Sequence, residues 1–192
     1  TPADAELEAD LDPLRVPPAE GRGVLLTGAN GFLGAHLVGE LLRAGAFTIF
    51  APVRAASDAQ ARLRVEAALA HYGLTPLPED DRVQVFAADI GRSAFGLDRA
   101  RYESIAHEVH AVLHCAAAVS WTAAYEALRD ANVETTRALL RFACTATRKR
   151  FHFVSSVAAC YSTRGPAEVH EDGAVADLDG MHLGYAPSNW AA

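Results

Sequence analysis

The 192-residue sequence predicts an α/β fold in which helices cover both faces of a parallel sheet. Three observations favour this class. From residue 23 onward, short β-branched and aliphatic runs alternate with helical stretches, as in chains built from strand–helix–strand units. A glycine-rich turn follows the first of these runs. The hydrophobic fraction of 51% is large enough to bury a core beneath both layers of helices.

Strands are expected where apolar runs are short, and helices where apolar residues recur every three or four positions. The expected strands are residues 23–27, 47–53, 82–88, 111–115 and 150–155, and the expected helices are residues 32–44, 58–71 and 132–147. Ser57 or Asp58 is suited to cap the second helix, and Gly73 is suited to end it.

The ends of the chain differ from this regular middle. Residues 1–22 are acidic and contain a proline pair, which predicts a short helix followed by an extended linker. Residues 23–192 are expected to form one domain, in which the polar segment 162–184 is a functional loop. A doubly wound sheet that stops near residue 192 lacks its last strands, so we expect a truncated domain.

Composition excludes several classes of function. The 17 basic and 24 acidic residues give a net charge of −7 with no basic stripe, which argues against a nucleic-acid partner. No apolar run approaches the ~18 residues of a membrane-spanning helix. Three widely spaced cysteines indicate reduced thiols in a cytoplasmic protein. His107, His110 and His114 do not share a helical face, so no metal site is predicted.

The turn after the first expected strand carries the strongest chemical signal. Its glycines Gly28, Gly31 and Gly34 are three residues apart. The first permits a tight turn, the second lets the backbone approach a pyrophosphate, and the third lets helix and strand pack closely. Because the turn joins a strand to a helix, it predicts a Rossmann-type dinucleotide site. Its other expected cofactor contacts are Thr27, Asn30, Phe32 and Leu33.

A basic residue at the end of the second expected strand indicates which dinucleotide binds. NAD sites place an acidic residue about 20 positions after the glycine turn, whereas Arg54 stands there in this chain. A guanidinium suits the 2′-phosphate of NADPH, and Arg62 or Arg64 on the following helix is placed to add a second contact. The alternative is that Arg54 is a solvated charge at a strand end.

Other strand ends are expected to line the same crevice, since ligands of open α/β sheets bind at the carboxyl ends of the strands. Asp89 and Ile90 follow the third strand, in reach of an adenine. The small residues Ala116, Ala117 and Ala118 follow the fourth strand and allow the backbone to approach the cofactor. Ser156 ends the fifth strand, near the expected nicotinamide position.

These motifs together resemble a known family. The segments TGANGFLG, HCAAAV, FVSSV and GYAPSNW are similar to those of the extended short-chain dehydrogenase/reductases. Within that group the sequence is most similar to the terminal thioester reductase domains of nonribosomal peptide and polyketide synthases and of carboxylic acid reductases. The resemblance runs from about residue 7 to residue 190. It implies NADPH-dependent reduction of a phosphopantetheine thioester to an aldehyde, and in some members onward to the alcohol.

The resemblance also implies partners and catalytic residues. The acidic lead-in is similar to the linker that follows an acyl or peptidyl carrier protein, and a substrate-binding lobe would follow residue 192. Ser156 takes the place of the family's catalytic threonine or serine, and Tyr185 that of its tyrosine. Both would hydrogen-bond the developing oxyanion, with Tyr185 supplying the proton.

One position departs from the family pattern. Four residues after the tyrosine the family has a lysine that binds the nicotinamide ribose and favours the ionised tyrosine, whereas this sequence has Asn189. The only lysine, Lys149, precedes the fifth strand, at the opposite end of the sheet. A slow or inactive reductase, a non-redox release or docking domain, and a nucleotide-sugar epimerase or dehydratase therefore remain alternatives.

Overall fold

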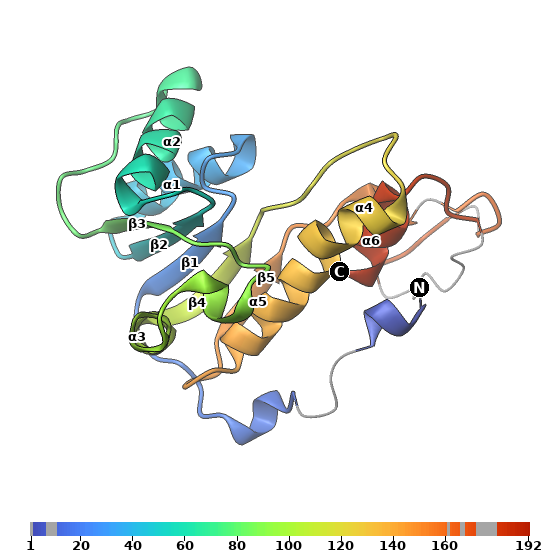
Figure 1. The fold of residues 1–192 in the computed structure, drawn as a ribbon, viewed down its shortest axis with the longest axis horizontal. Coiled ribbons are helices and arrows are strands. Elements are labelled where there is room, and N and C mark those ends of the chain that lie inside the picture. The colour runs from blue at the N-terminus through green and yellow to red at the C-terminus, as the bar shows by residue number, and fades with distance from the viewer. Residues whose placement is uncertain (1, 7–10, 161, 166–167, 172–179) are drawn as a thin grey trace. The chain divides into compact units, whose positions relative to one another are not determined.

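The computed structural model describes residues 2–6, 11–160, 162–165, 168–171 and 180–192 (Figure 1). Their contacts group the chain into two compact units. The first, the sheet unit, comprises Ala9–Ala116 and Ala138–Val154. The second, the helical unit, comprises Thr1–Glu8, Ala117–Arg137 and Ser155–Ala192.

Five parallel strands form the centre of the sheet unit, in the order β3-β2-β1-β4-β5. The strands are β1 (Gly23–Thr27), β2 (Thr48–Val53), β3 (Val83–Ala87), β4 (Val109–His114) and β5 (Arg150–Phe153). The chain moves outward from β1 to one edge and then returns to build the other edge from β4. This order confirms the predicted doubly wound, Rossmann-type sheet, whose reversal point lies between β1 and β4.

Helices cover both faces of this sheet because neighbouring strand residues point to opposite sides. Leu26 packs with Val38 of α1 (Phe32–Ala44) and Val65 of α2 (Asp58–His71). The preceding residue, Leu25, packs with Ile105 of α3 (Arg99–Glu108) and Phe142 of α5 (Thr135–Ala143). All of these side chains are buried. Burial of each one stabilises the folded state by about 1.5–3 kcal/mol.

The helical unit contains short elements from distant parts of the chain. These are η1 (Pro2–Ala5), α4 (Tyr125–Arg129), the π-helical turn η4 (Asp130–Glu134), η5 (Val157–Cys160) and α6 (Tyr185–Ala191). The turn η4 continues α4 into α5 without a break. Helix α6 contacts η5, α4, η4 and η1, and a small core of Ala158, Met181 and Ala186 lies between η5 and α6.

Two helical segments were not predicted from the sequence. Helix α3 buries only Ile105 and Ala106, so its apolar pattern is too sparse to detect. The helix expected over residues 132–147 instead begins at Tyr125 and ends at Ala143. The left-handed conformation of Ala146, with a φ of 60°, ends any continuation of the helix there. The 3-10 turns η2 (Pro13–Arg15) and η3 (Ser93–Gly96) complete the described elements.

Part of the acidic lead-in is held in place by a buried carboxylate. Asp4 is 8% exposed and accepts hydrogen bonds from the Tyr125 hydroxyl at 2.7 Å and from Arg129 Nε at 2.9 Å. Arg137 Nη2 donates to the backbone carbonyl of Asp4 at 2.7 Å. Residues 2–6 are therefore packed on α4 and on the start of α5 by charge-assisted hydrogen bonds.

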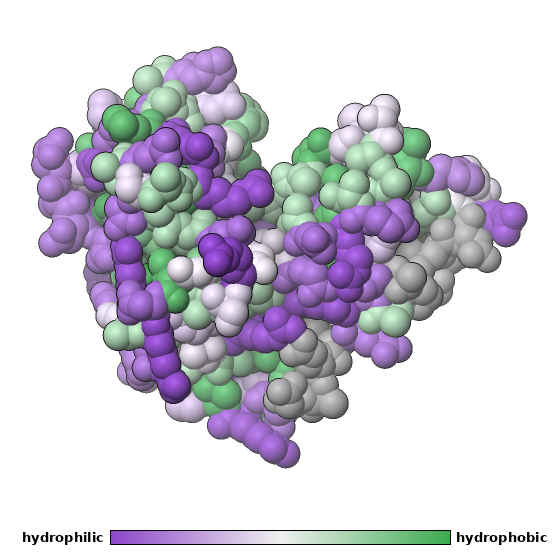
Figure 2. Space-filling model, in the orientation of Figure 1, coloured by the Kyte–Doolittle hydropathy of each residue, from purple (hydrophilic) through white to green (hydrophobic). Residues whose placement is uncertain are grey.

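The surface drawn in Figure 2 mixes hydrophilic residues with smaller areas of apolar ones. Among the residues that the structure describes, no helix combines the length and the apolar character needed to cross a membrane. Within the same residues, His, Cys, Asp and Glu side chains do not gather in groups of three or more that could hold a metal ion.

Candidate active site

The glycine turn between β1 and α1 is shaped by close backbone contacts. Gly28 has a φ of 72°, and a Cβ atom there would lie 3.0 Å from the backbone nitrogen of Ala116. A Cβ atom on Gly34 would lie 2.0 Å from the carbonyl oxygen of Gly28. Gly31 caps α1 without a side-chain hydrogen bond, so the first amides of this 13-residue helix remain available to an anion. These features fit a bound pyrophosphate.

The remaining residues of the turn are divided between the interior and the surface. Thr27 is fully buried, whereas Asn30, Phe32 and Leu33 are exposed at the start of α1. Thr27 Oγ1 accepts hydrogen bonds from the backbone nitrogens of Cys115 and Ala116, both at 3.1 Å. The hydroxyl thus ties the segment after β4 to the end of β1.

A neutral histidine completes this contact. Thr27 Oγ1 lies 2.8 Å from His114 Nδ1. Because the oxygen already accepts two backbone donors, its own proton goes to Nδ1, and His114 carries its proton on Nε2. His114 is 1% exposed, and burial lowers its pKa to about 4. The imidazole is therefore uncharged at neutral pH.

The basic residues predicted to recognise a 2′-phosphate have different surroundings. Arg54 is exposed directly after β2, and Arg64 Nη1 donates to its backbone carbonyl. Arg62 instead pairs with Glu66 at 2.8 Å and donates to the carbonyl of Pro78 at 2.9 Å. The structure thus brings Arg64, rather than Arg62, to Arg54.

The acidic residue after β3 lies in a tight turn. Asp89 is exposed, and its Oδ1 atom accepts a hydrogen bond from Gly91 N at 3.3 Å. Ile90 is half-buried against the core that contains Phe95. The predicted adenine contact of these two residues stays a prediction.

The two residues expected to act on substrate both belong to the helical unit. Ser156 is half-buried just before η5, and its Oγ atom accepts a hydrogen bond from Ala158 N at 3.2 Å. Tyr185 is the first residue of α6, which packs against η5. Its ring centroid lies 6.2 Å from that of Trp121.

A glycine fixes the start of α6. A Cβ atom on Gly184 would lie 2.3 Å from the backbone nitrogen of Tyr125, and Gly184 N donates to the carbonyl of Ala123 at 3.2 Å. The backbone before Tyr185 therefore touches the backbone at the start of α4. The position of Tyr185 depends on this approach.

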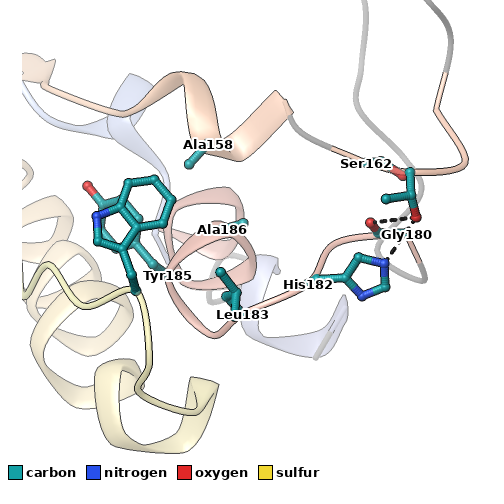
Figure 3. Close-up of a pocket in the computed structure, with 9 residues that line it drawn as sticks. Ala158, Ser162, Gly180, His182, Leu183, Tyr185 and Ala186 are labelled. Carbon is teal, nitrogen blue, oxygen red and sulfur yellow. Dashed lines mark hydrogen bonds between the residues drawn. The ribbon is translucent and has the colours of Figure 1, made fainter.

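A pocket of about 340 Å³ opens beside Tyr185 (Figure 3). Its lining residues all belong to the helical unit. They are Trp121, Ala158, Ser162, Thr163, Gly180, His182, Leu183, Tyr185 and Ala186.

Comparisons with known proteins show which family the chain resembles in sequence and fold. A family described as Male sterility protein, an NAD-binding family, matches residues 26–192. The isonitrile lipopeptide synthase of Streptomyces coeruleorubidus is 37% identical over 195 residues, which span 99% of this chain and 13% of that protein. The terminal R domain from the myxalamid PKS-NRPS pathway is 33% identical, with a TM-score of 0.90 over 99% of this chain and 49% of that one.

The reductase (R) domain of a nonribosomal peptide synthetase from Mycobacterium tuberculosis is 31% identical, with a TM-score of 0.76 over 98% of this chain and 47% of that one. The chain belongs to this reductase family. It has the NAD(P)-binding Rossmann fold of the extended short-chain dehydrogenase/reductases, and it spans about half the length of the solved reductase domains.

A buried amide that sequence reasoning did not place in the site connects two segments of the helical unit. Asn132 is 4% exposed in the π-helical turn η4. It accepts from Ala118 N at 2.7 Å and donates to Ala118 O at 3.1 Å and to Ser188 Oγ at 2.9 Å. Ser188 Oγ in turn donates to the carbonyl of Tyr185 at 2.9 Å. One side chain thus holds the segment after β4 and the helix that carries Tyr185.

The three alanines predicted to face the cofactor, residues 116–118, lie where the chain passes from the sheet unit to the helical unit. Ala116 is held by Thr27 in the sheet unit, Ala118 is held by Asn132 in the helical unit, and Ala117 between them is exposed. No local sequence pattern links Asn132 to Ser188, which lies three residues after Tyr185.

Asn189, which stands where the family pattern has a lysine, is buried and hydrogen-bonded. Asn189 lies one helical turn after Tyr185, as expected, and is 6% exposed. Its Nδ2 atom donates to the backbone carbonyl of Tyr185 at 3.1 Å. The amide therefore hydrogen-bonds back to the first residue of its own helix.

Lys149 does not replace the missing lysine. Its Nζ atom donates to the carbonyls of Thr145 at 2.7 Å and Thr147 at 2.9 Å, just beyond α5. It is 5% exposed, and burial lowers its pKa to about 8. The only lysine thus stabilises the end of a helix.

Proposed function

We propose that the chain is the nucleotide-binding part of an NADPH-dependent reductase that releases an acyl or peptidyl thioester as an aldehyde, with onward reduction to the alcohol as a second step. The observation that carries this proposal is a glycine turn with an uncapped helix start, found together with Ser156 and Tyr185 at the family's catalytic positions. Arg54 after β2, with no acidic residue before Asp58, supports NADPH over NADH.

The residues of this chain have separate tasks in the proposed reaction. The backbone of Gly28 and Gly31 would accommodate the pyrophosphate of the cofactor, and Arg54 its 2′-phosphate. When bound, NADPH supplies the hydride that the thioester carbonyl carbon accepts. Ser156 and Tyr185 would donate hydrogen bonds to the carbonyl oxygen as negative charge develops on it.

Tyr185 then gives its proton to that oxygen, which forms a hemithioacetal on the substrate. The carbon–sulfur bond of the hemithioacetal then breaks and the thiolate takes the electron pair. The hydroxyl proton passes to the ionised Tyr185 oxygen as the aldehyde forms, which restores the tyrosine. Because a thiolate is a good leaving group, this collapse needs little acid assistance. Asn189 in place of a lysine is therefore compatible with slow turnover.

We also propose that the thioester is carried by the phosphopantetheine arm of an upstream acyl or peptidyl carrier protein. Two observations support this partner. Relatives of the chain are far larger proteins with the names of peptide synthases, and the chain spans only 13% of the Streptomyces relative. The segment 2–6, which precedes the nucleotide-binding sheet, is anchored on α4 through Asp4.

Turnover by the full protein that carries this chain tests the proposal. We expect NADPH consumption with a pantetheine thioester to be matched by aldehyde formation. Tyr185→Phe should lower the rate by about 10²-fold, because the oxyanion loses its proton donor. Asn189→Lys should raise the rate, since it restores the charge that favours the ionised tyrosine.

One alternative has a specific observation in its favour. The Asn189 side chain donates to the backbone carbonyl of Tyr185 and brings no positive charge to the tyrosine, which favours a release or docking domain without redox activity. Thioester cleavage without NADPH consumption, unchanged by Tyr185→Phe, would support this alternative and contradict the reductase.

A further inference from the structure

The pocket beside Tyr185 is lined by apolar surface near the tyrosine and by polar groups at its other end (Figure 3). The apolar part consists of the Trp121 indole, the methyl groups of Ala158 and Ala186, and the Leu183 side chain. These side chains come from three separate segments of the helical unit. At about 340 Å³, the pocket lies within the range of small-molecule sites.

The polar groups at the other end of the pocket are hydrogen-bonded to one another. Thr163 Oγ1 donates to the carbonyl of Gly180 at 3.3 Å and lies 3.1 Å from His182 Nε2. Since the threonine proton is used, His182 donates to the hydroxyl oxygen. The backbone nitrogen of Thr163 also donates to Gly180 at 2.9 Å. The polar groups at this end therefore hydrogen-bond to one another.

Among the residues that the structure describes, the nine that line the pocket include no lysine, arginine, aspartate or glutamate. A charged group that entered the apolar part would lose water and find no carboxylate, ammonium or guanidinium among these nine side chains, which is costly. An apolar group would instead remove the Trp121 and Leu183 side chains from water. Those side chains are 65% and 55% exposed in the structure.

Backbone strain accompanies one of these exposed side chains. Leu183 has a φ of 69°, a left-handed conformation that is rare for a bulky residue. Such strain concentrates at ligand sites. Leu183 is thus held in an unfavourable conformation with its side chain on the pocket wall.

We propose that this pocket binds the apolar acyl part of the thioester, an aliphatic or aromatic chain without charge in the portion that follows the carbonyl. This inference rests on the proposed function, because it places the reacting carbonyl at Tyr185. The chain extends from the tyrosine along the Trp121 and Leu183 side chains. Leu183 determines the acyl preference.

Calorimetric binding of short thioester analogues to this chain tests the proposal without any redox step. The probes are the N-acetylcysteamine thioesters of octanoate, of glutarate with a free carboxylate, and of 6-aminohexanoate. We expect the octanoyl probe to bind at least ~10-fold more tightly than either charged probe, a difference of about 1.4 kcal/mol.

Variants at Leu183 sharpen the test, because Asn and Asp tolerate its backbone conformation. Leu183→Asp should weaken octanoyl binding by ~10-fold or more, and Leu183→Arg should improve glutaryl binding while it weakens octanoyl binding. Leu183→Asn controls for the loss of the apolar side chain without a charge. Leu63→Asp, on the exposed face of α2, introduces the same charge outside the pocket and should change neither affinity.

Three results would overturn the proposal: no octanoyl binding at millimolar concentration, equal binding of charged and uncharged probes, or equal losses in Leu183→Asp and Leu63→Asp. Failure of the proposed reductase has a different signature. In that case the octanoyl probe binds with the expected selectivity, but the full protein consumes no NADPH in its presence.

Discussion

The hydrogen bond between Thr27 and His114 shows how a single protonation state supports the cofactor turn. Thr27 can hold Cys115 and Ala116 only while its own proton goes to a neutral imidazole. Protonation of His114 would place two donors against each other in a buried site. The pKa of about 4 reflects the cost of that charge.

This pair predicts a pH dependence of stability. In the unfolded chain His114 takes up a proton below its ordinary pKa of 6.5, whereas in the folded chain it does so only near 4. The unfolded state therefore binds more protons in this window, and the free energy of unfolding falls as the pH drops from 6.5 toward 4. The full effect is at most ~3 kcal/mol.

Urea denaturation of wild type and His114→Asn at pH 7.5 and 4.5 measures this effect. We expect the wild type to lose about 2 kcal/mol more than the variant over this range, since asparagine accepts the Thr27 proton but does not titrate. His107→Asn, exposed on α3, should behave as wild type. Equal losses in wild type and His114→Asn would show that the imidazole does not remain neutral.

At the scale of elements, close backbone packing determines the conformation of the glycine turn between β1 and α1. Gly34 and Gly39 both lie in α1, but only Gly34 packs against Gly28 and Ala29. A Cβ atom at Gly39 meets nothing within 4 Å. The two glycines thus form a matched pair for substitution.

Gly34→Ala should abolish NADPH binding, because the added methyl group displaces the carbonyl of Gly28 and the start of α1. Gly39→Ala should leave binding unchanged and stabilise the helix by about 0.5–1 kcal/mol. Fluorescence titration with NADPH and thermal unfolding of both variants provide the readouts. Retained NADPH affinity in a folded Gly34→Ala protein would rule out the turn as the binding element.

The π-helical turn η4 makes a second prediction at this scale. Asn132→Asp keeps the acceptor for Ala118 N but loses the donors to Ala118 O and Ser188 Oγ. We expect a loss of about 1–3 kcal/mol in urea unfolding, since buried acceptors lose their partner. Gln84→Glu makes the same change on the exposed side of β3 and should cost little. A similar small cost for Asn132→Asp would contradict its bridging role.

The sequence predicted those helices and strands whose position follows from a local pattern of apolar or capping residues. Strands β1 and β2 were predicted because buried strands are nearly continuously apolar, and β3, β4 and β5 because short apolar runs recur between helical stretches. Helix α2 was predicted because Ser57 and Gly73 mark its ends. Helix α3 was missed because most of its residues face solvent, and α4 because its apolar face consists of Leu128 alone.

The same limit applies to the site. The glycine spacing predicted the turn between β1 and α1, because a Cβ atom at Gly28 or Gly34 would come too close to neighbouring backbone atoms. The bridge from Asn132 to Ser188 joins positions 56 residues apart, which no local pattern reveals. The environment of Arg62 likewise depends on Pro78, sixteen residues away, rather than on the helix that carries it.

At the scale of the whole molecule, the proposed tasks are divided between the two units. The glycine turn and Arg54 belong to the sheet unit, whereas Ser156, Tyr185 and the apolar pocket belong to the helical unit. We therefore expect Gly34→Ala to remove NADPH binding but not octanoyl thioester binding, and Leu183→Asp to do the reverse. Loss of both affinities in either variant, measured by calorimetry, would contradict this division.

The most direct test of the proposed cofactor is a calorimetric titration of this chain with NADPH and with NADH. We expect NADPH to bind at least ~10-fold more tightly, and Arg54→Ser to remove most of that difference, because the guanidinium loses its charge-assisted hydrogen bonds to the 2′-phosphate. Equal affinities for the two nucleotides, or no binding of either, would contradict an NADPH-dependent reductase.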